Sequence, residues 1–139
     1  MKNCTATATA ATSTVLTTAA KLFINVVLEY LMFWAVRVEV AACDEEDVYI
    51  YGIRPLFKLD KRFKSYFDVE YIRLGVPDDP DLVEAVYTLN DTGKKAARAC
   101  VKKYYKHPYF AKAWEKRTLG MTASEVIKAR NAIANMIAR

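Results

Sequence analysis

The segment from Leu16 to Val36 constrains the fold most, because no other stretch of the chain is long and apolar enough to cross a bilayer. A membrane helix needs about 20 apolar residues, and this segment supplies 21 positions. Lys21, Asn25 and Glu29 interrupt it at intervals of four, so on an α-helix they form one polar row. A carboxylate near mid-bilayer is costly unless it is paired or faces protein. The sequence therefore predicts a transmembrane helix whose row Lys21, Asn25, Glu29 docks against a helix of another subunit.

Two alternatives to this interpretation are open. The segment also fits an amphipathic helix in the core of a soluble protein, with the polar row on its wet side. Within a membrane, Glu29 could instead belong to a proton path, because an intramembrane acid is a functional candidate by default. The flanking charges favour an N-terminus on the matrix or cytoplasmic side, whereas the later basic region favours the reverse orientation.

The chain divides into four parts around this helix. Residues 1–14 are rich in Ala and Thr and contain no acid, which indicates an uncleaved leader. Residues 15–43 are predicted as the transmembrane helix and its extension, 44–58 as an acidic to extended linker, and 59–139 as a helical extramembrane region. The expected fold class is mainly α, with one N-terminal transmembrane helix, a small helical region outside the membrane and at most one short extended segment.

Residue patterns predict the elements after the membrane helix. Alternating apolar and tyrosine side chains predict an extended segment over 48–53. Apolar residues at helical spacing and local start and stop signals predict helices over 59–74, 82–89, 94–106 and 108–117. Asp81 and Glu84 resemble a capping box for the second of these helices. Thr122 and Glu125 form a clearer one, which predicts a final helix after Gly120.

The net charge of +5 is concentrated late in the chain. Residues 94–117 contain nine Lys or Arg and a single acid, Glu115, with tyrosines and a tryptophan among them. The basic face predicted to bind a partner consists of Lys94, Lys95, Arg98, Lys102, Lys103, Lys106 and Lys112. Such a face can bind anionic lipid such as cardiolipin, acidic neighbouring subunits or nucleic-acid phosphates, or it can simply be a solvated helix surface.

Catalytic and metal-binding patterns are missing from the sequence. It holds one histidine, His107, and three cysteines without metal-type spacing. Its four glycines form no phosphate-binding loop. We therefore expect no enzymatic activity, no cofactor, no metal and no small-molecule substrate. A bridge between Cys43 and Cys100 is an open possibility if this part of the chain lies in an oxidising compartment.

By its general plan of leader, single span and small basic helical extension, the chain resembles the accessory subunits of mitochondrial respiratory complexes and ATP synthase. The resemblance implies a non-catalytic structural subunit of the mitochondrial inner membrane, or of another organelle membrane, with other subunits of a membrane complex as partners. It would contribute one membrane helix and a peripheral helical clamp. The alternative is a soluble, basic, all-α nucleic-acid-binding protein, such as a ribosomal component.

Overall fold

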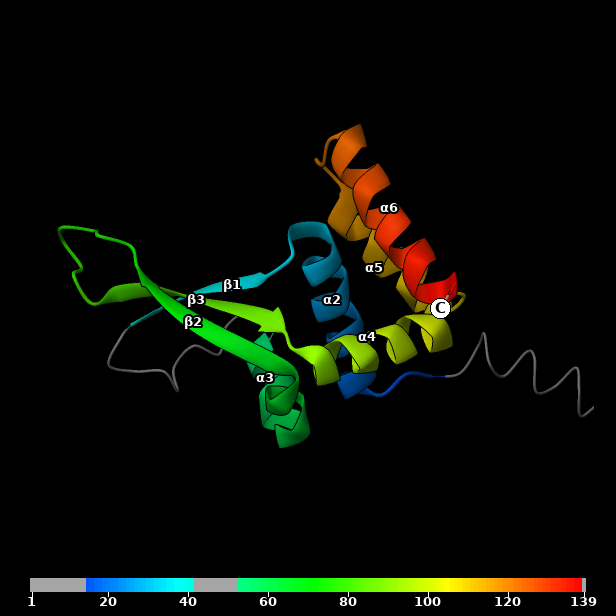
Figure 1. The fold of residues 1–139 in the computed structure, drawn as a ribbon, viewed down its shortest axis with the longest axis horizontal. Helices are drawn as coiled ribbons and strands as arrows, with labels where there is room; N and C mark the ends of the chain where they lie inside the picture. The colour runs from blue at the N-terminus through cyan, green and yellow to red at the C-terminus, as the bar shows by residue number, and fades with distance from the viewer. Residues whose placement is uncertain (1–14, 42–52, 139) are drawn as a thin grey trace, which may run out of the picture.

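The computed structural model describes residues 15–41 and 53–138 and shows helices packed beside a three-stranded sheet (Figure 1). In chain order the elements are α2 (Thr18–Phe33), β1 (Val36–Ala41), α3 (Ile53–Leu59), the 3₁₀ helix η2 (Lys61–Tyr66), β2 (Phe67–Arg73), β3 (Leu82–Leu89), α4 (Asp91–Tyr104), α5 (Pro108–Thr118) and α6 (Ala123–Ala138). The sheet projects to one side of the helices, and α2 runs through their middle.

The transmembrane prediction is wrong for the described residues. Helix α2 has 16 residues, and no helix in the described ranges is long and apolar enough to cross a membrane. The helix ends because Trp34 adopts a left-handed conformation with φ 60°, after which Val36 begins a strand. In that strand, Val36 and Val38 are buried and alternate with exposed Arg37. The end of the apolar run thus has the period of a strand.

The apolar surface of α2 is covered by the chain itself. Helices α3, α4, α5 and α6 and strand β1 all contact it. Seven of its side chains are buried: Phe23, Ile24, Val26, Val27, Leu28, Leu31 and Met32. A helix that is apolar over most of its surface suits the centre of a protein core as well as it suits a membrane. The width of the apolar surface therefore indicated burial and left the surrounding medium undetermined.

The sheet corrects the mainly α prediction. Its strand order is β1-β3-β2, and both pairs are antiparallel. The helices predicted over 59–74 and 82–89 are instead η2 with β2, and β3. In β3 the side chains of Val83, Ala85 and Tyr87 alternate onto one face and are buried. The same eight residues also match a short helical pattern, and pairing with both neighbouring strands decides in favour of the strand.

The helical predictions for the C-terminal part are confirmed. Helices α4, α5 and α6 occupy the segments expected from their spacing and end signals. The Glu125 N–H donates to Thr122 Oγ1 at 3.2 Å, and the Thr122 N–H donates to Glu125 Oε1 at 3.0 Å, which completes the capping box. Gly120 has φ 78°, as expected at a helix stop. Most of the extended segment predicted over 48–53 lies outside the described residues.

The sheet joins α4 through a close backbone contact at Gly93. The Asn90 N–H donates to the Tyr66 carbonyl at 3.0 Å, and Asn90 Oδ1 accepts from the Gly93 N–H at 2.8 Å. A Cβ at position 93 would collide with that same carbonyl oxygen and would lie 2.9 Å from Leu89 Cδ2. Only glycine lets the first turn of α4 approach the last residue of η2 this closely.

We therefore expect Gly93→Ala to destabilise the protein by about 1–3 kcal/mol, even though alanine is the better helix former. Urea unfolding followed by circular dichroism measures the change. Thr92→Ala, at the exposed neighbouring position, is the control and should stay within about 0.5 kcal/mol of the wild type. Equal stabilities of the two variants would contradict the close contact.

Candidate functional site

The polar row of α2 lies against α5 of the same chain. Asn25 Nδ2 donates to Tyr109 Oη at 2.7 Å and to the Lys21 carbonyl at 2.8 Å. Arg117 Nη1 forms an ion pair with Glu29 Oε1 at 3.1 Å, and Arg117 Nε donates to Asn25 Oδ1 at 3.3 Å. All these atoms belong to α2 and α5, so the row positions one helix of the fold against another.

Lys21 extends the contact with α5 at the N-terminal end of the row. Its ammonium lies 5.6 Å from the centroid of the Tyr109 ring, a distance typical of a cation–π contact. Each of the three residues predicted as a docking face thus has a partner on α5. The interval of four placed these side chains on one face of the helix, but the predicted partner was a helix of another subunit, and the partner in this structure is α5 of the same chain.

The predicted basic face divides between two helices. Lys94, Arg98 and Lys102 follow one another at intervals of four, so they form a row along α4. Lys95 and Lys103 lie beside the row, Lys106 follows the end of α4, and Lys112 is on α5. All seven side chains are exposed except that of Arg98, which is half-buried.

Few of these cations are neutralised within the protein. Of the nine Lys and Arg between residues 94 and 117, only Arg117 forms an ion pair with an acid among the residues that the structure describes. Lys103 lies 5.3 Å from the Tyr104 ring centroid and Lys106 lies 5.5 Å from that of Tyr105. Both tyrosines are half-buried and pack against the core, and the lysine ammonium groups lie near their rings at the surface.

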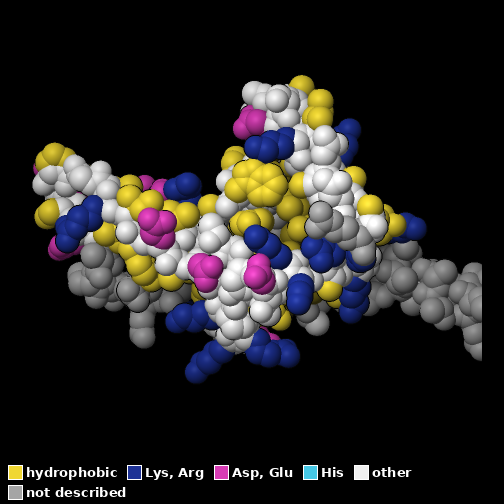
Figure 2. All heavy atoms as spheres, viewed as in Figure 1, with side chains coloured by type: hydrophobic (Ala, Val, Ile, Leu, Met, Phe, Trp, Pro, Cys, Tyr) yellow, Lys and Arg dark blue, Asp and Glu magenta, His cyan; other side chains and the backbone are white. Residues whose placement is uncertain are grey.

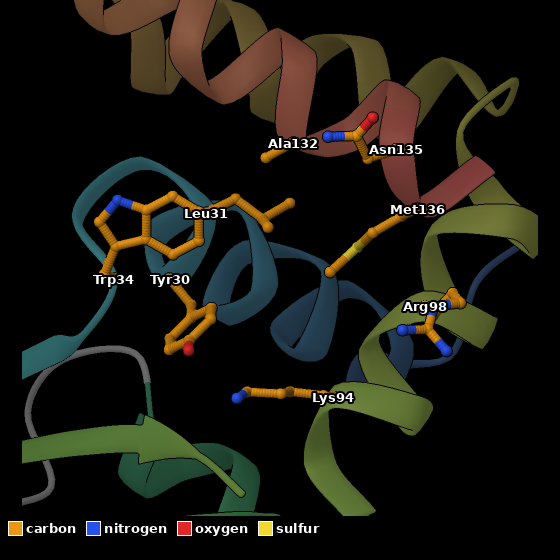
Figure 3. A pocket seen from close by; sticks show the side chains of 8 residues that line it. All are labelled: Tyr30, Leu31, Trp34, Lys94, Arg98, Ala132, Asn135 and Met136. Atoms are coloured by element: carbon orange, nitrogen blue, oxygen red, sulfur yellow. The ribbon is translucent and has the colours of Figure 1, made fainter. Parts of the chain in front are cut away.

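A cleft adjoins the row on α4. It has a volume of about 460 Å³ and lies between α2, α4 and α6 (Figure 3). Its lining combines two cations, two aromatic rings, one amide and apolar side chains: Lys94, Arg98, Tyr30, Trp34, Asn135, Leu31, Ala132 and Met136. None of the described residues that line it is a carboxylate. On the face shown in Figure 2, hydrophobic side chains gather in this region, with Lys and Arg side chains around them.

Arg98 is the most unusual residue of the cleft. Its Nε atom is buried and has no hydrogen-bond partner in residues 15–41 and 53–138. A buried donor without a partner costs about 1–3 kcal/mol, and more when the group is charged. Figure 3 shows Arg98 on one side of Met136 and Lys94, with Tyr30 and Trp34 on the other side. An anion in the cleft would meet cations that the described chain leaves without an acidic partner.

Sequence reasoning placed Lys94 and Arg98 in a site but missed the residues opposite them. Tyr30 and Trp34 lie in the segment predicted as a transmembrane helix, and Asn135 and Met136 lie in the predicted final helix, outside the predicted site. The one signal for them in the sequence is that Tyr30 and Trp34 are aromatic and are spaced one helical turn apart, near the end of an apolar run. Nothing local in the sequence connects that pair with α4 or α6.

The other groups singled out in the sequence have structural roles. His107 caps α5, because its Nδ1 accepts from the Tyr109 N–H at 3.0 Å. Cys100 is a free, buried thiol, and burial raises its pKa to about 12, so it stays protonated at neutral pH. Cys43 lies outside the described residues. Within those residues, no group of three or more His, Cys, Asp or Glu could hold a metal ion.

Comparisons with known proteins do not identify a relative: no family model, no curated protein and no solved structure matches the chain. The function is therefore argued from the chemistry of the site, since a fold alone does not define one. The site offers unpaired cations, aromatic rings and one amide. These groups bind anions and planar rings.

The contact between α2 and α5 yields a test of the polar row. Asn25→Ala and Tyr109→Phe each remove one end of the 2.7 Å hydrogen bond, and we expect a coupling energy of about 1 kcal/mol in a double-mutant cycle of unfolding free energies. A matched cycle that pairs Asn25→Ala with Tyr105→Phe should give a coupling below about 0.5 kcal/mol. Equal coupling in the two cycles would show that the helices do not meet at Asn25.

Proposed function

We propose that the protein binds nucleic acid through the basic face of α4 and α5. The observation that carries this proposal is the set of cations between residues 94 and 117 that have no acidic partner among the described residues. Phosphate groups attract such a surface by releasing the counterions condensed on the nucleic acid. The row Lys94, Arg98, Lys102 rises by about 6 Å per step, so it presents a line of cations to a backbone that is itself a line of charges.

The distribution of charge along the chain supports the same conclusion. Residues 94–139 contain 12 Lys or Arg and two acids, whereas residues 1–93 contain nine Lys or Arg and 14 acids. A polyanion is attracted to the first of these parts and repelled by the second. The segregation therefore favours one orientation of the protein on a nucleic acid. A solvated surface without a partner needs no such segregation.

Nucleic-acid binding was the alternative function predicted from the sequence, although the fold is mixed and not all-α. The preference for lipid and subunit contacts depended on a membrane helix, and no helix in the described residues can span a membrane. The accessory-subunit role and the mitochondrial location stay predictions.

One observation favours binding of a protein partner as a second candidate function. Exposed apolar side chains lie along β2 and in the turn after it, namely Val69, Tyr71, Ile72, Leu74 and Val76.

The test neutralises part of the basic face. We expect K102Q/K103Q/K106Q to weaken binding of an RNA oligonucleotide, because each lysine removed loses a phosphate contact. The slope of log K against log salt should fall by about 2, since each contact to a single strand contributes about 0.7. Fluorescence anisotropy over a salt series measures both quantities.

The matched control K61Q/K64Q/R73Q removes the same charge from η2 and β2. It should leave the salt slope close to that of the wild type. Equal loss of binding in the two variants would mean that net charge alone attracts RNA. No RNA binding by the wild type, with binding to vesicles of anionic lipid instead, would also contradict the proposal.

A further inference from the structure

We infer that the cleft between α2, α4 and α6 binds one unstacked nucleotide, with its phosphate at Lys94 and Arg98 and its base against Trp34 and Tyr30. This inference rests on the proposed function and adds to it a preference for single strands. It starts from a cavity lined by two cations from α4 and by two aromatic rings from the C-terminal end of α2.

The cationic side fits a phosphate. Arg98 presents a planar guanidinium with several donors in a fixed arrangement, and such a group pairs well with phosphate oxygens. In residues 15–41 and 53–138 the guanidinium forms no ion pair, and none of the lining residues among them is a carboxylate that could compete with a phosphate. Lys94 lies one turn earlier on the same side of α4 and supplies a second cation.

The aromatic side fits a base. The rings of Tyr30 and Trp34 meet edge to face with their centroids 6.0 Å apart, and Trp34 remains 46% exposed. Bases stack on such rings whatever their sequence. The Lys128 ammonium lies 5.5 Å from the Trp34 ring, so a third cation borders this side of the cleft.

The α6 side supplies the rest of the recognition. Met136 and Ala132 give an apolar surface, and the Asn135 amide carries both donors and an acceptor for the edge of a base. The volume of about 460 Å³ is within the range of small-molecule pockets and suits one nucleotide.

A preference for single-stranded over duplex nucleic acid follows from this geometry. A base inside a duplex is stacked and paired, and it must be extruded at a cost of a few kcal/mol before it can enter a pocket. A base in a single strand is already free to do so. The cleft therefore adds affinity only for single strands, while the lysines of α4 and α5 attract the phosphates of single strands and duplexes alike.

The first experiment measures binding by variants of the full chain. We expect Trp34→Leu to weaken binding of a uridine oligomer of about 12 nucleotides roughly tenfold and to leave binding of an RNA duplex unchanged. Phe33→Leu, at the neighbouring position outside the cleft, is the control and should bind both as the wild type does. Arg98→Gln should weaken single-strand binding in the same way, because it removes the fork that holds the phosphate.

The second experiment needs no change in the cleft, so it remains decisive if Trp34→Leu fails to fold. The chain contains two tryptophans, and Trp114→Phe leaves Trp34 as the only one. We expect the uridine oligomer and uridine 5′-monophosphate to quench its fluorescence, and inorganic phosphate to compete with the monophosphate.

The outcomes separate this inference from the proposed function. Single-strand binding that depends on Lys102, Lys103 and Lys106, without quenching of Trp34 or an effect of Trp34→Leu, overturns the inference and leaves the proposed function standing. No binding of RNA by the wild type overturns both. Quenching of Trp34 by vesicles of anionic lipid, with none by the oligomer, overturns the inference in favour of a lipid headgroup.

Discussion

The burial of α2 is the constraint on which the rest of the structure depends. One helix meets four other helices and a strand, so each of those elements is positioned by what it covers. Seven of its 16 side chains are buried, and the row Lys21, Asn25, Glu29 is the only polar line along it. That row selects α5, because Tyr109 and Arg117 supply the partners that a half-buried amide and a half-buried carboxylate require. The apolar part of the surface of α2 can be buried by any well-packed apolar neighbour.

Sequence reasoning succeeded where the signal was local. The C-terminal helices carry their own caps and stops, such as the Thr122 and Glu125 box, and these act without help from distant residues. It failed for the sheet, because residues 82–89 fit both a short helix and a strand, and the choice is made by pairing with β1 and β2. The transmembrane prediction failed for a related reason. Hydrophobicity reports that a surface must be covered, and it does not report what covers it.

In the candidate site, too, local features were predictable from the sequence and contacts between distant segments were not. The cations of α4 were found because a helix places residues at intervals of four in one row. Tyr30 and Trp34 were visible as a pair, but their relation to Lys94 depends on how α2 and α4 pack, which no local pattern encodes. Asn135 comes from a third helix, and its place in the cleft requires the positions of α2, α4 and α6 together. The residues of a cleft formed by several elements are therefore predictable singly, and their proximity is not.

The arrangement of charge on α4 works against the stability of the helix. Like charges at intervals of four, as in Lys94, Arg98 and Lys102, each cost a helix a few tenths of a kcal/mol. Lys94 and Lys95 also lie near the positive end of the helix dipole, where acids would be stabilising. The helix is held in spite of these repulsions by the burial of Ala97, Cys100 and Val101 on its other side. A bound polyanion of the kind proposed above would relieve the repulsion within the row.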